Sequence, residues 1–117
     1  MFLDLTPLGM ESKCIEDSSI TASSIYNQYT HPYYGRVNSN NVWCPRENVG
    51  TPYLQVKLPN TISLCGIGTQ GGAEKDGNLM YGKNYSVSVS SDGQPTNWSS
   101  IKHDGATRVR PESNVAF

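Results

Sequence analysis

Residues 53–58 alternate apolar and polar side chains, and this period of two is the feature that most limits how the chain can fold. One face of the segment would carry Leu54, Val56 and Leu58, which is the pattern of a half-buried strand. A turn signal, Pro59-Asn60, follows directly, so we expect the strand to end there.

Other segments extend this β pattern. Residues 62–67 are apolar on both faces, as expected of a central strand, and residues 85–90 alternate Tyr or Val with Ser. Residues 91–93, Ser-Asp-Gly, predict a turn in which the glycine takes a positive φ. We interpret residues 20–24 as a strand and residues 25–34 as a loop. Several short strands without a convincing helix predict an all-β sandwich or barrel.

The length and net charge of the chain limit the classes of function that it can have. The chain has 117 residues, the size of one domain, and a net charge of −1, which gives no electrostatic case for a nucleic-acid partner. No apolar run approaches the ~20 residues of a membrane-spanning helix. Residues 1–7 are too short and too acidic for a secretory signal, so the chain is either cytosolic or lacks its true N-terminus.

The three cysteines also leave two alternatives open. In a secreted domain an odd count indicates a free thiol or a partner outside the chain, whereas in the cytosol reduced thiols are ordinary. A zinc site is not expected, because no two cysteines have close ligand spacing and His31 and His103 do not cluster with them.

Short motifs spread over residues 7–98 occur in a characteristic order and spacing. They are Pro-Leu-Gly-Met-Glu-Ser at 7–12, Ile-Thr-Ala-Ser-Ser at 20–24, Gly-Arg-Val-Asn at 35–38, Val-Trp-Cys-Pro at 42–45, Leu-Gln-Val-Lys-Leu at 54–58, Gly-Ile-Gly-Thr-Gln-Gly at 66–71, Met-Tyr-Gly-Lys-Asn-Tyr at 80–85, and Ser-Asp-Gly at 91–93 with Trp98. In this combination the chain resembles the discoidin family, also called coagulation factor 5/8 type C domains. The resemblance implies an all-β, jelly-roll (galactose-binding-like) β-sandwich with ligand-contacting loops at one end.

The resemblance also sets the expected domain limits. Residues 7–117 would form a partial discoidin domain, and residues 1–6 would be an N-terminal extension. Family members continue into further strands, whereas residues 101–116 show no recognisable pattern. We therefore expect a sandwich that is incomplete at its C-terminus, from a fragment of a larger secreted or membrane-anchored protein.

The same resemblance assigns the cysteines. It implies that Cys14 pairs with a terminal cysteine absent here, and that Cys44 pairs with another late partner that is also missing. Cys65 is expected to be a small core residue. No internal disulfide is therefore expected.

Three loops are the candidate ligand-binding site. Loop one (residues 25–34) would present Tyr29 and His31 at its tip, although packing of its tyrosines at the loop base is the alternative. Loop two (residues 45–52) offers charged side chains, as does loop three (residues 72–80), although ordinary solvation is the alternative for these charges. The charged candidates are Arg46 and Glu47 in loop two, and Glu74 and Lys75 in loop three.

Other residues are expected to be structural. Met80 and Tyr81 fall where loop three returns to the sheet, so we expect them in the core. The two tryptophans, Trp43 and Trp98, are also expected to pack in the core, and Arg36 to hold a loop base through its fork of donors.

The expected ligand is a cell-surface or matrix glycan or protein. Membrane phospholipid ranks lower, because burying the carboxylates of loop three in a bilayer is costly. Asn97 and Asn84 each begin an Asn-x-Ser triplet and are candidate glycosylation sites. Some family members hold a calcium ion in loops, but no specific carboxylate cluster marks such a site here.

No catalytic motif is present, so we do not expect an enzyme. The first hypothesis is an extracellular adhesion or lectin-like recognition module. The second is a non-catalytic targeting domain of a larger secreted enzyme or receptor.

Overall fold

The computed structural model describes residues 7–47, 50–63, 67–73, 77–82, 85–94, 97–101 and 111–116. Their regular elements, in chain order, are the 3-10 helix η1 (Asp17–Ser19), β1 (Ile20–Ala22), the 3-10 helix η2 (Pro32–Gly35), β2 (Leu54–Ser63), β3 (Gly72–Ala73), β4 (Leu79–Met80), β5 (Val87–Ser90), β6 (Ser99–Ile101) and β7 (Pro111–Ala116). The expected all-β class is confirmed.

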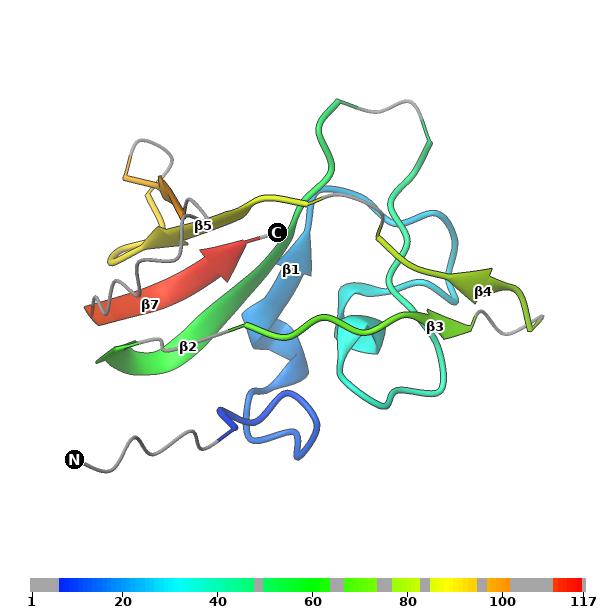
Figure 1. Ribbon diagram of the computed structural model, residues 1–117, viewed down its shortest axis with the longest axis horizontal. Helices are drawn as coiled ribbons and strands as arrows, with labels where there is room; N and C mark the ends of the chain where they lie inside the picture. The colour runs from blue at the N-terminus through cyan, green and yellow to red at the C-terminus, as the bar shows by residue number, and fades with distance from the viewer. Residues whose placement is uncertain are drawn as a thin grey trace.

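The main sheet has five strands in the order β1-β2-β7-β5-β6, and every neighbouring pair is antiparallel (Figure 1). A separate two-stranded sheet joins β3 to β4. Strand β7 lies between β2 and β5, with Ala116 opposite both Gln55 and Ser88. Residues 101–116, where no strand was expected, therefore supply a central strand of the sheet.

Strand β2 corrects the expected end of the strand at Pro59-Asn60. The strand continues through this pair to Ser63, and its register against β7 shifts between Lys57 and Ile62. Proline cannot donate to a strand ladder, so it is tolerated at such an irregularity. The separate strand expected at residues 62–67 is thus partly the end of β2, since Ile67 lies outside a strand and residues 64–66 lie outside the described residues.

The core forms where β1, β2 and β5 face the N-terminal segment. Its buried apolar residues are Ile15, Ile20, Leu54, Val56, Leu58 and Val89. Partly buried Trp43 packs against this cluster. The alternation of residues 53–58 therefore buries the face that was expected, and Lys57 on the opposite face is exposed.

Two expected strands are shorter than the sequence indicated. Strand β1 ends at Ala22, and at the next residue the ladder is replaced by a side-chain contact: the Ser23 N–H donates to the Tyr53 carbonyl, whereas the Tyr53 N–H donates to the Ser23 hydroxyl. Strand β5 begins only at Val87. The turn expected at residues 91–93 is confirmed, with Gly93 at φ +72°.

The antiparallel register defines the two ends of the main sheet. Ala22, the last residue of β1, pairs with Leu54, the first residue of β2. Strands β2 and β5 both run antiparallel to β7, so β5 also begins at this end. Loops one and two join the sheet here, and the β3–β4 hairpin lies on the same side (Figure 1). We call this the loop end.

Candidate functional site

Loop one is built around a tight turn from Asn27 to Thr30. The Thr30 hydroxyl accepts a hydrogen bond from the Asn27 N–H at 3.0 Å and donates to the Asn27 carbonyl at 3.1 Å. The Asn27 side-chain oxygen accepts from the Tyr29 N–H at 2.8 Å. Thr30 is only 1% exposed, whereas Tyr29 is exposed. The turn is therefore fixed from inside while it presents the Tyr29 ring outward.

His31, directly before η2, lies in an aromatic stack. Its ring is stacked on that of Tyr33, with centroids 5.2 Å apart and planes at 9°, and Tyr34 tilts against both rings. All three side chains are half-buried. Partial burial raises the pKa of Tyr33 above its ordinary value of 10.0, and Tyr34 and Asp17 add to the shift. Tyr33 and Tyr34 therefore pack together at the base of loop one, and the ring of His31 packs with them.

Loops one and two are tied together by hydrogen bonds. The Tyr26 N–H donates to the Cys44 carbonyl at 2.8 Å. Ser24 accepts from the Arg46 N–H at its hydroxyl and from the Trp43 indole N–H at its carbonyl, both at 3.0 Å. Because several hydrogen bonds join the bases of the two loops, the exposed residues Tyr26 and Arg46 belong to one hydrogen-bonded unit.

Loop three is a hairpin made by β3 and β4. Its first strand packs closely on the stem of loop two, since a Cβ on Gly72 would lie 2.6 Å from Val42 Cγ1. Leu79 is 85% exposed and Tyr81 is 72% exposed, while Met80 between them is half-buried. The expectation that Tyr81 packs in the core was wrong, because this side chain, directly after β4, is largely exposed to solvent.

The Thr69-Gln70-Gly71 motif connects these parts. The Gln70 side chain accepts from the Asn38 N–H at 2.8 Å and donates to the Asn38 side-chain oxygen at 3.0 Å. Asn38 has a φ of +58°, a left-handed conformation that asparagine tolerates better than most residues. The Thr69 hydroxyl lies 3.2 Å from the Tyr85 hydroxyl. The motif therefore fixes the segment that leads into loop three.

The predicted site residues are only partly brought together. Tyr29 of loop one and Arg46 and Glu47 of loop two are exposed at the loop end. Glu74 and Lys75 lie outside the described residues, as does Asn84. Sequence reasoning missed the exposed side chains Tyr26, Leu79 and Tyr81. For the last two, the apolar run of residues 79–81 at the end of a charged loop was the available signal.

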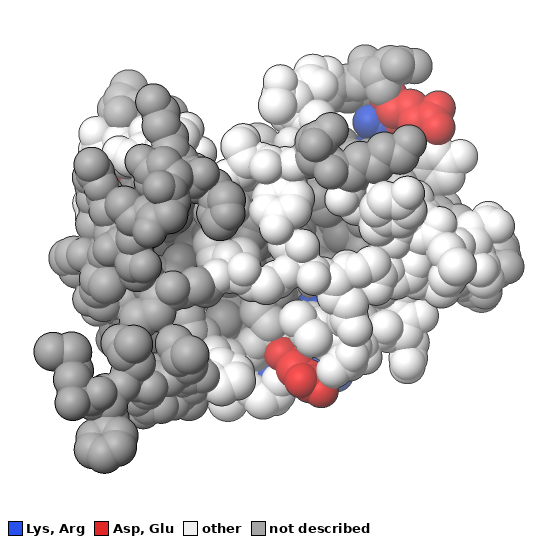
Figure 2. All heavy atoms as spheres, in the orientation of Figure 1, with Lys and Arg blue, Asp and Glu red and all other residues white. Residues whose placement is uncertain are grey.

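One face of the molecule carries few charged side chains among its described residues. Figure 2 shows that most described residues on the face in view carry no charge. Among the described residues, no group of three or more His, Cys, Asp or Glu side chains is arranged to hold a metal ion. Within that part of the chain no helix is long and apolar enough to cross a membrane.

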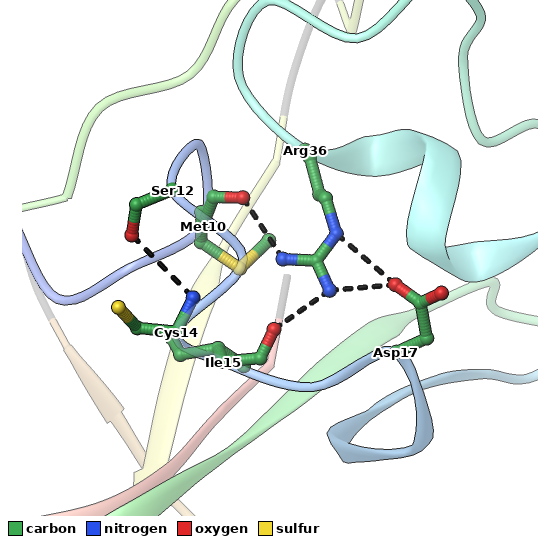
Figure 3. Close-up of polar contacts among 6 residues, drawn as sticks. All are labelled: Met10, Ser12, Cys14, Ile15, Asp17 and Arg36. Carbon is green, nitrogen blue, oxygen red and sulfur yellow. Dashed lines mark hydrogen bonds and ion pairs between the residues drawn. The ribbon is translucent and has the colours of Figure 1, made fainter.

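Arg36 links the N-terminal segment to the end of η2 (Figure 3). Its guanidinium donates to the Met10 carbonyl at 2.9 Å and to the Ile15 carbonyl at 2.7 Å. Arg36 is buried, so the expected structural role is confirmed. Nearby Cys14 is an exposed, free thiol, and its sulfur points away from Arg36 in Figure 3. The half-buried Cys44 has its sulfur 3.6 Å from the Pro45 carbonyl oxygen.

Comparison with known proteins decides the family. The model of the F5/8 type C domain family matches residues 19–116. This chain belongs to that family. The F5/8 type C match includes β7, which lies within residues 101–116, the segment without a recognisable pattern in the sequence.

Relatives agree with this assignment. The chain is 36% identical over 107 residues to the human EGF-like repeat and discoidin I-like domain-containing protein 3, covering 85% of this chain and 22% of that protein. It is 39% identical to pig coagulation factor VIII, covering 88% of this chain and 5% of the factor. It is 34% identical to rat lactadherin, covering 88% of this chain and 26% of lactadherin. The chain thus spans about a quarter or less of each of these relatives.

A solved structure supports the fold. The chitosan-binding module 1 of a chitosanase/glucanase from Paenibacillus sp. IK-5 superposes with a TM-score of 0.55 at 25% identity, covering 83% of this chain and 77% of that module. Together with the family match, it places this chain among galactose-binding-like β-sandwiches. Family and neighbour both indicate a ligand-binding module.

Proposed function

We propose that this F5/8 type C domain is an extracellular recognition module that binds a glycan at its loop end. The observation that carries the proposal is the exposure of three tyrosines, Tyr26, Tyr29 and Tyr81, on loops joined by hydrogen bonds and close packing. Tyrosine offers a large flat surface and a polar hydroxyl at low entropic cost. Such rings suit stacking on the faces of sugar rings.

The polar groups of loop two fit the same ligand class. Exposed Arg46 offers a fork of donors and exposed Glu47 offers acceptors, which match the hydroxyl and amine groups of sugars. The solved neighbour is named for binding chitosan, a polymer of an amino sugar, and this supports a glycan ligand.

A glycan array followed by calorimetry on the best hit tests this proposal. We expect Tyr29→Ala and Tyr81→Ala each to weaken glycan binding by about tenfold or more, as does the loss of an aromatic side chain that a bound ligand covers. Gln94→Ala, at an exposed position beyond β5, is the matched control and should bind normally. No glycan hit, or equal affinity in all the variants, would overturn the assignment.

The place of the domain in a larger protein is part of the proposal. Because the chain spans only a small share of its relatives, the module would serve adhesion or tether a larger secreted enzyme or receptor to a surface. A protein ligand at the same loop end is the remaining outcome. Binding to a matrix protein that Tyr29→Ala abolishes, without any glycan hit, would establish it.

One observation favours a second candidate, binding to phosphatidylserine bilayers. Leu79 is 85% exposed beside Tyr81, and insertion of exposed apolar side chains is what drives interfacial membrane binding. Sedimentation with phosphatidylserine vesicles, compared with phosphatidylcholine vesicles, separates the two candidates. If Leu79→Ser abolishes vesicle binding, the result favours bilayer binding as the function. If the Leu79→Ser variant still binds a glycan, the result favours glycan binding.

A further inference from the structure

An acceptor sequence for N-linked glycosylation, Asn97-Trp98-Ser99, lies away from the loop end and has no part in the proposed ligand site. Asn97 is exposed and immediately precedes the half-buried Trp98, and Ser99 is the exposed first residue of β6. The middle residue is not proline, which the acceptor pattern excludes. The sequence pattern therefore coincides with an accessible position in the fold.

The backbone and the side chain of Asn97 are both held in place. Its N–H donates to the Gln94 carbonyl at 3.0 Å, and its side-chain Nδ2 donates to Asp92 Oδ2 at 2.7 Å. A primary amide carries two N–H groups, so the bond to Asp92 uses one and leaves the other. A sugar on Nδ2 would replace only the second hydrogen, and the bond to Asp92 would persist.

The site lies toward the end of the sheet opposite the loop end. Strand β5 begins at the loop end and runs away from it to Ser90, and β6 returns from Ser99, so Asn97 lies beyond the far end of the pair. Strand β6 is also the outer strand in the order β1-β2-β7-β5-β6. Figure 1 shows β6, in orange, on the side away from β3 and β4. A glycan here would leave the loop end clear.

We propose that Asn97 carries an N-linked glycan that covers the free edge of β6. An outer strand presents unpaired backbone groups that can pair with another chain, and bulky solvated groups beside it hinder such pairing. The glycan would thus keep the domain monomeric at the edge where β6 pairs with no further strand of the described residues.

The chemistry is a group transfer carried out by an oligosaccharyltransferase of the secretory pathway. The donor is an oligosaccharide linked through a diphosphate to a lipid. The bond between sugar C1 and the phosphate oxygen breaks, and a bond between C1 and Nδ2 of Asn97 forms. The amide gives up one proton and the lipid diphosphate leaves, with no oxidation or reduction.

Secretion of the whole chain from eukaryotic cells tests the modification. We expect the intact mass to exceed that of the polypeptide, and peptide N-glycosidase to remove the excess and convert residue 97 to Asp in the peptide map. Ser99→Ala should abolish the glycan while keeping Asn97 itself. Ser100→Ala, the exposed neighbour on the same strand, should keep it. A secreted chain with unmodified Asn97, or with sugar only at Asn84, would overturn the assignment.

The role of the glycan has its own test. The folded, glycosylated chain is treated with peptide N-glycosidase without denaturant, and self-association is followed by analytical ultracentrifugation. We expect association to increase after the sugar is removed. Unchanged self-association over the same concentration range would refute the role of the glycan in covering β6. The mass measurements would still decide whether Asn97 is modified.

Discussion

Two nitrogen atoms of Arg36, Nε and Nη2, donate to the same carboxylate oxygen of Asp17, at 3.2 and 2.7 Å. The two ends of this pair differ in environment, since the side chain of Arg36 is 6% exposed and that of Asp17 is 62% exposed. Two further N–H groups of the guanidinium donate to backbone carbonyls of the N-terminal segment. The buried Arg36 therefore acts as a clamp that holds the backbone of the N-terminal segment, and the exposed Asp17 is its ion-pair partner.

Removal of this clamp should destabilise the domain. Arg36→Ala leaves the carbonyls of Met10 and Ile15 without their donor, and we expect a loss of about 2–4 kcal/mol in the free energy of unfolding. Urea denaturation followed by tryptophan fluorescence measures it. Asp17→Asn, which keeps both carbonyl contacts, should cost less than about 1 kcal/mol because Asp17 is exposed. Equal losses in the two variants would contradict this account.

The hydroxyl of Thr30 should control the order of loop one. Thr30→Val removes the acceptor for the Asn27 N–H, and we expect a cost of about 1–2 kcal/mol. Amide hydrogen exchange at Tyr29 should also become faster, because the turn that positions it loses the two hydrogen bonds made by the Thr30 hydroxyl. Thr30→Ser, which keeps the hydroxyl, is the control. A valine variant with the stability and exchange rate of the serine variant would disprove the role.

The contact between Gly72 and Val42 should couple loop three to the stem of loop two. Gly72→Ala places a methyl 2.6 Å from Val42 Cγ1, closer than real structures allow, and we expect a cost of about 1–3 kcal/mol. Val42→Ala removes the opposing methyl, so the double variant should lose less stability than the sum of the single changes. A double-mutant cycle in urea measures this coupling. If the stability losses of the two single variants simply add in the double variant, Gly72 and Val42 are not coupled.

Exposed Leu79 should be dispensable for folding. Leu79→Ser is expected to change the free energy of unfolding by no more than about 0.5 kcal/mol, because the side chain is almost fully solvated. Leu54→Ala, in the buried core, should cost about 2–5 kcal/mol. Thermal unfolding of both variants provides the measurement. A large loss for Leu79→Ser would mean that this side chain packs against the protein in solution.

The β5–β6 turn should make stability depend on pH through Asp92. Hydrogen bonds, first from the Gln94 N–H and then from the side chains of Asn97 and Ser90, hold the pKa of Asp92 below its ordinary value of 3.8. A carboxyl whose pKa is lower in the folded than in the unfolded state stabilises the fold fully above the unfolded value. This contribution is lost as the pH falls through the lower, folded pKa.

Asp92→Asn removes this dependence. We expect the wild-type protein to unfold at a higher temperature than the variant above pH 4, with the difference shrinking as the pH drops below 3.8. Calorimetric scans over a pH series follow the difference. Glu47→Gln, at an exposed carboxylate of loop two, is the matched control. A difference that stays constant down to pH 2 would exclude Asp92 as its source.

Local sequence patterns were reliable where burial has a fixed period. The alternation of residues 53–58 predicted the buried face of Leu54, Val56 and Leu58, because side chains of a strand point to opposite faces in turn. The end of that strand was wrong at Pro59, because pairing with β7 continues beyond the proline through a change of register. The family motifs predicted the fold, and the match to residues 19–116 confirms it.

The sequence by itself determined the all-β class, the family and one buried face, since these depend on residue order and a short period. Only the tertiary structure decided that residues 111–116 form a central strand, because their two partners, β2 and β5, are distant in sequence. It also decided which side chains the loop end presents. Exposure of Tyr26 and burial of Thr30 depend on neighbours brought together by folding, and no local pattern encodes those neighbours.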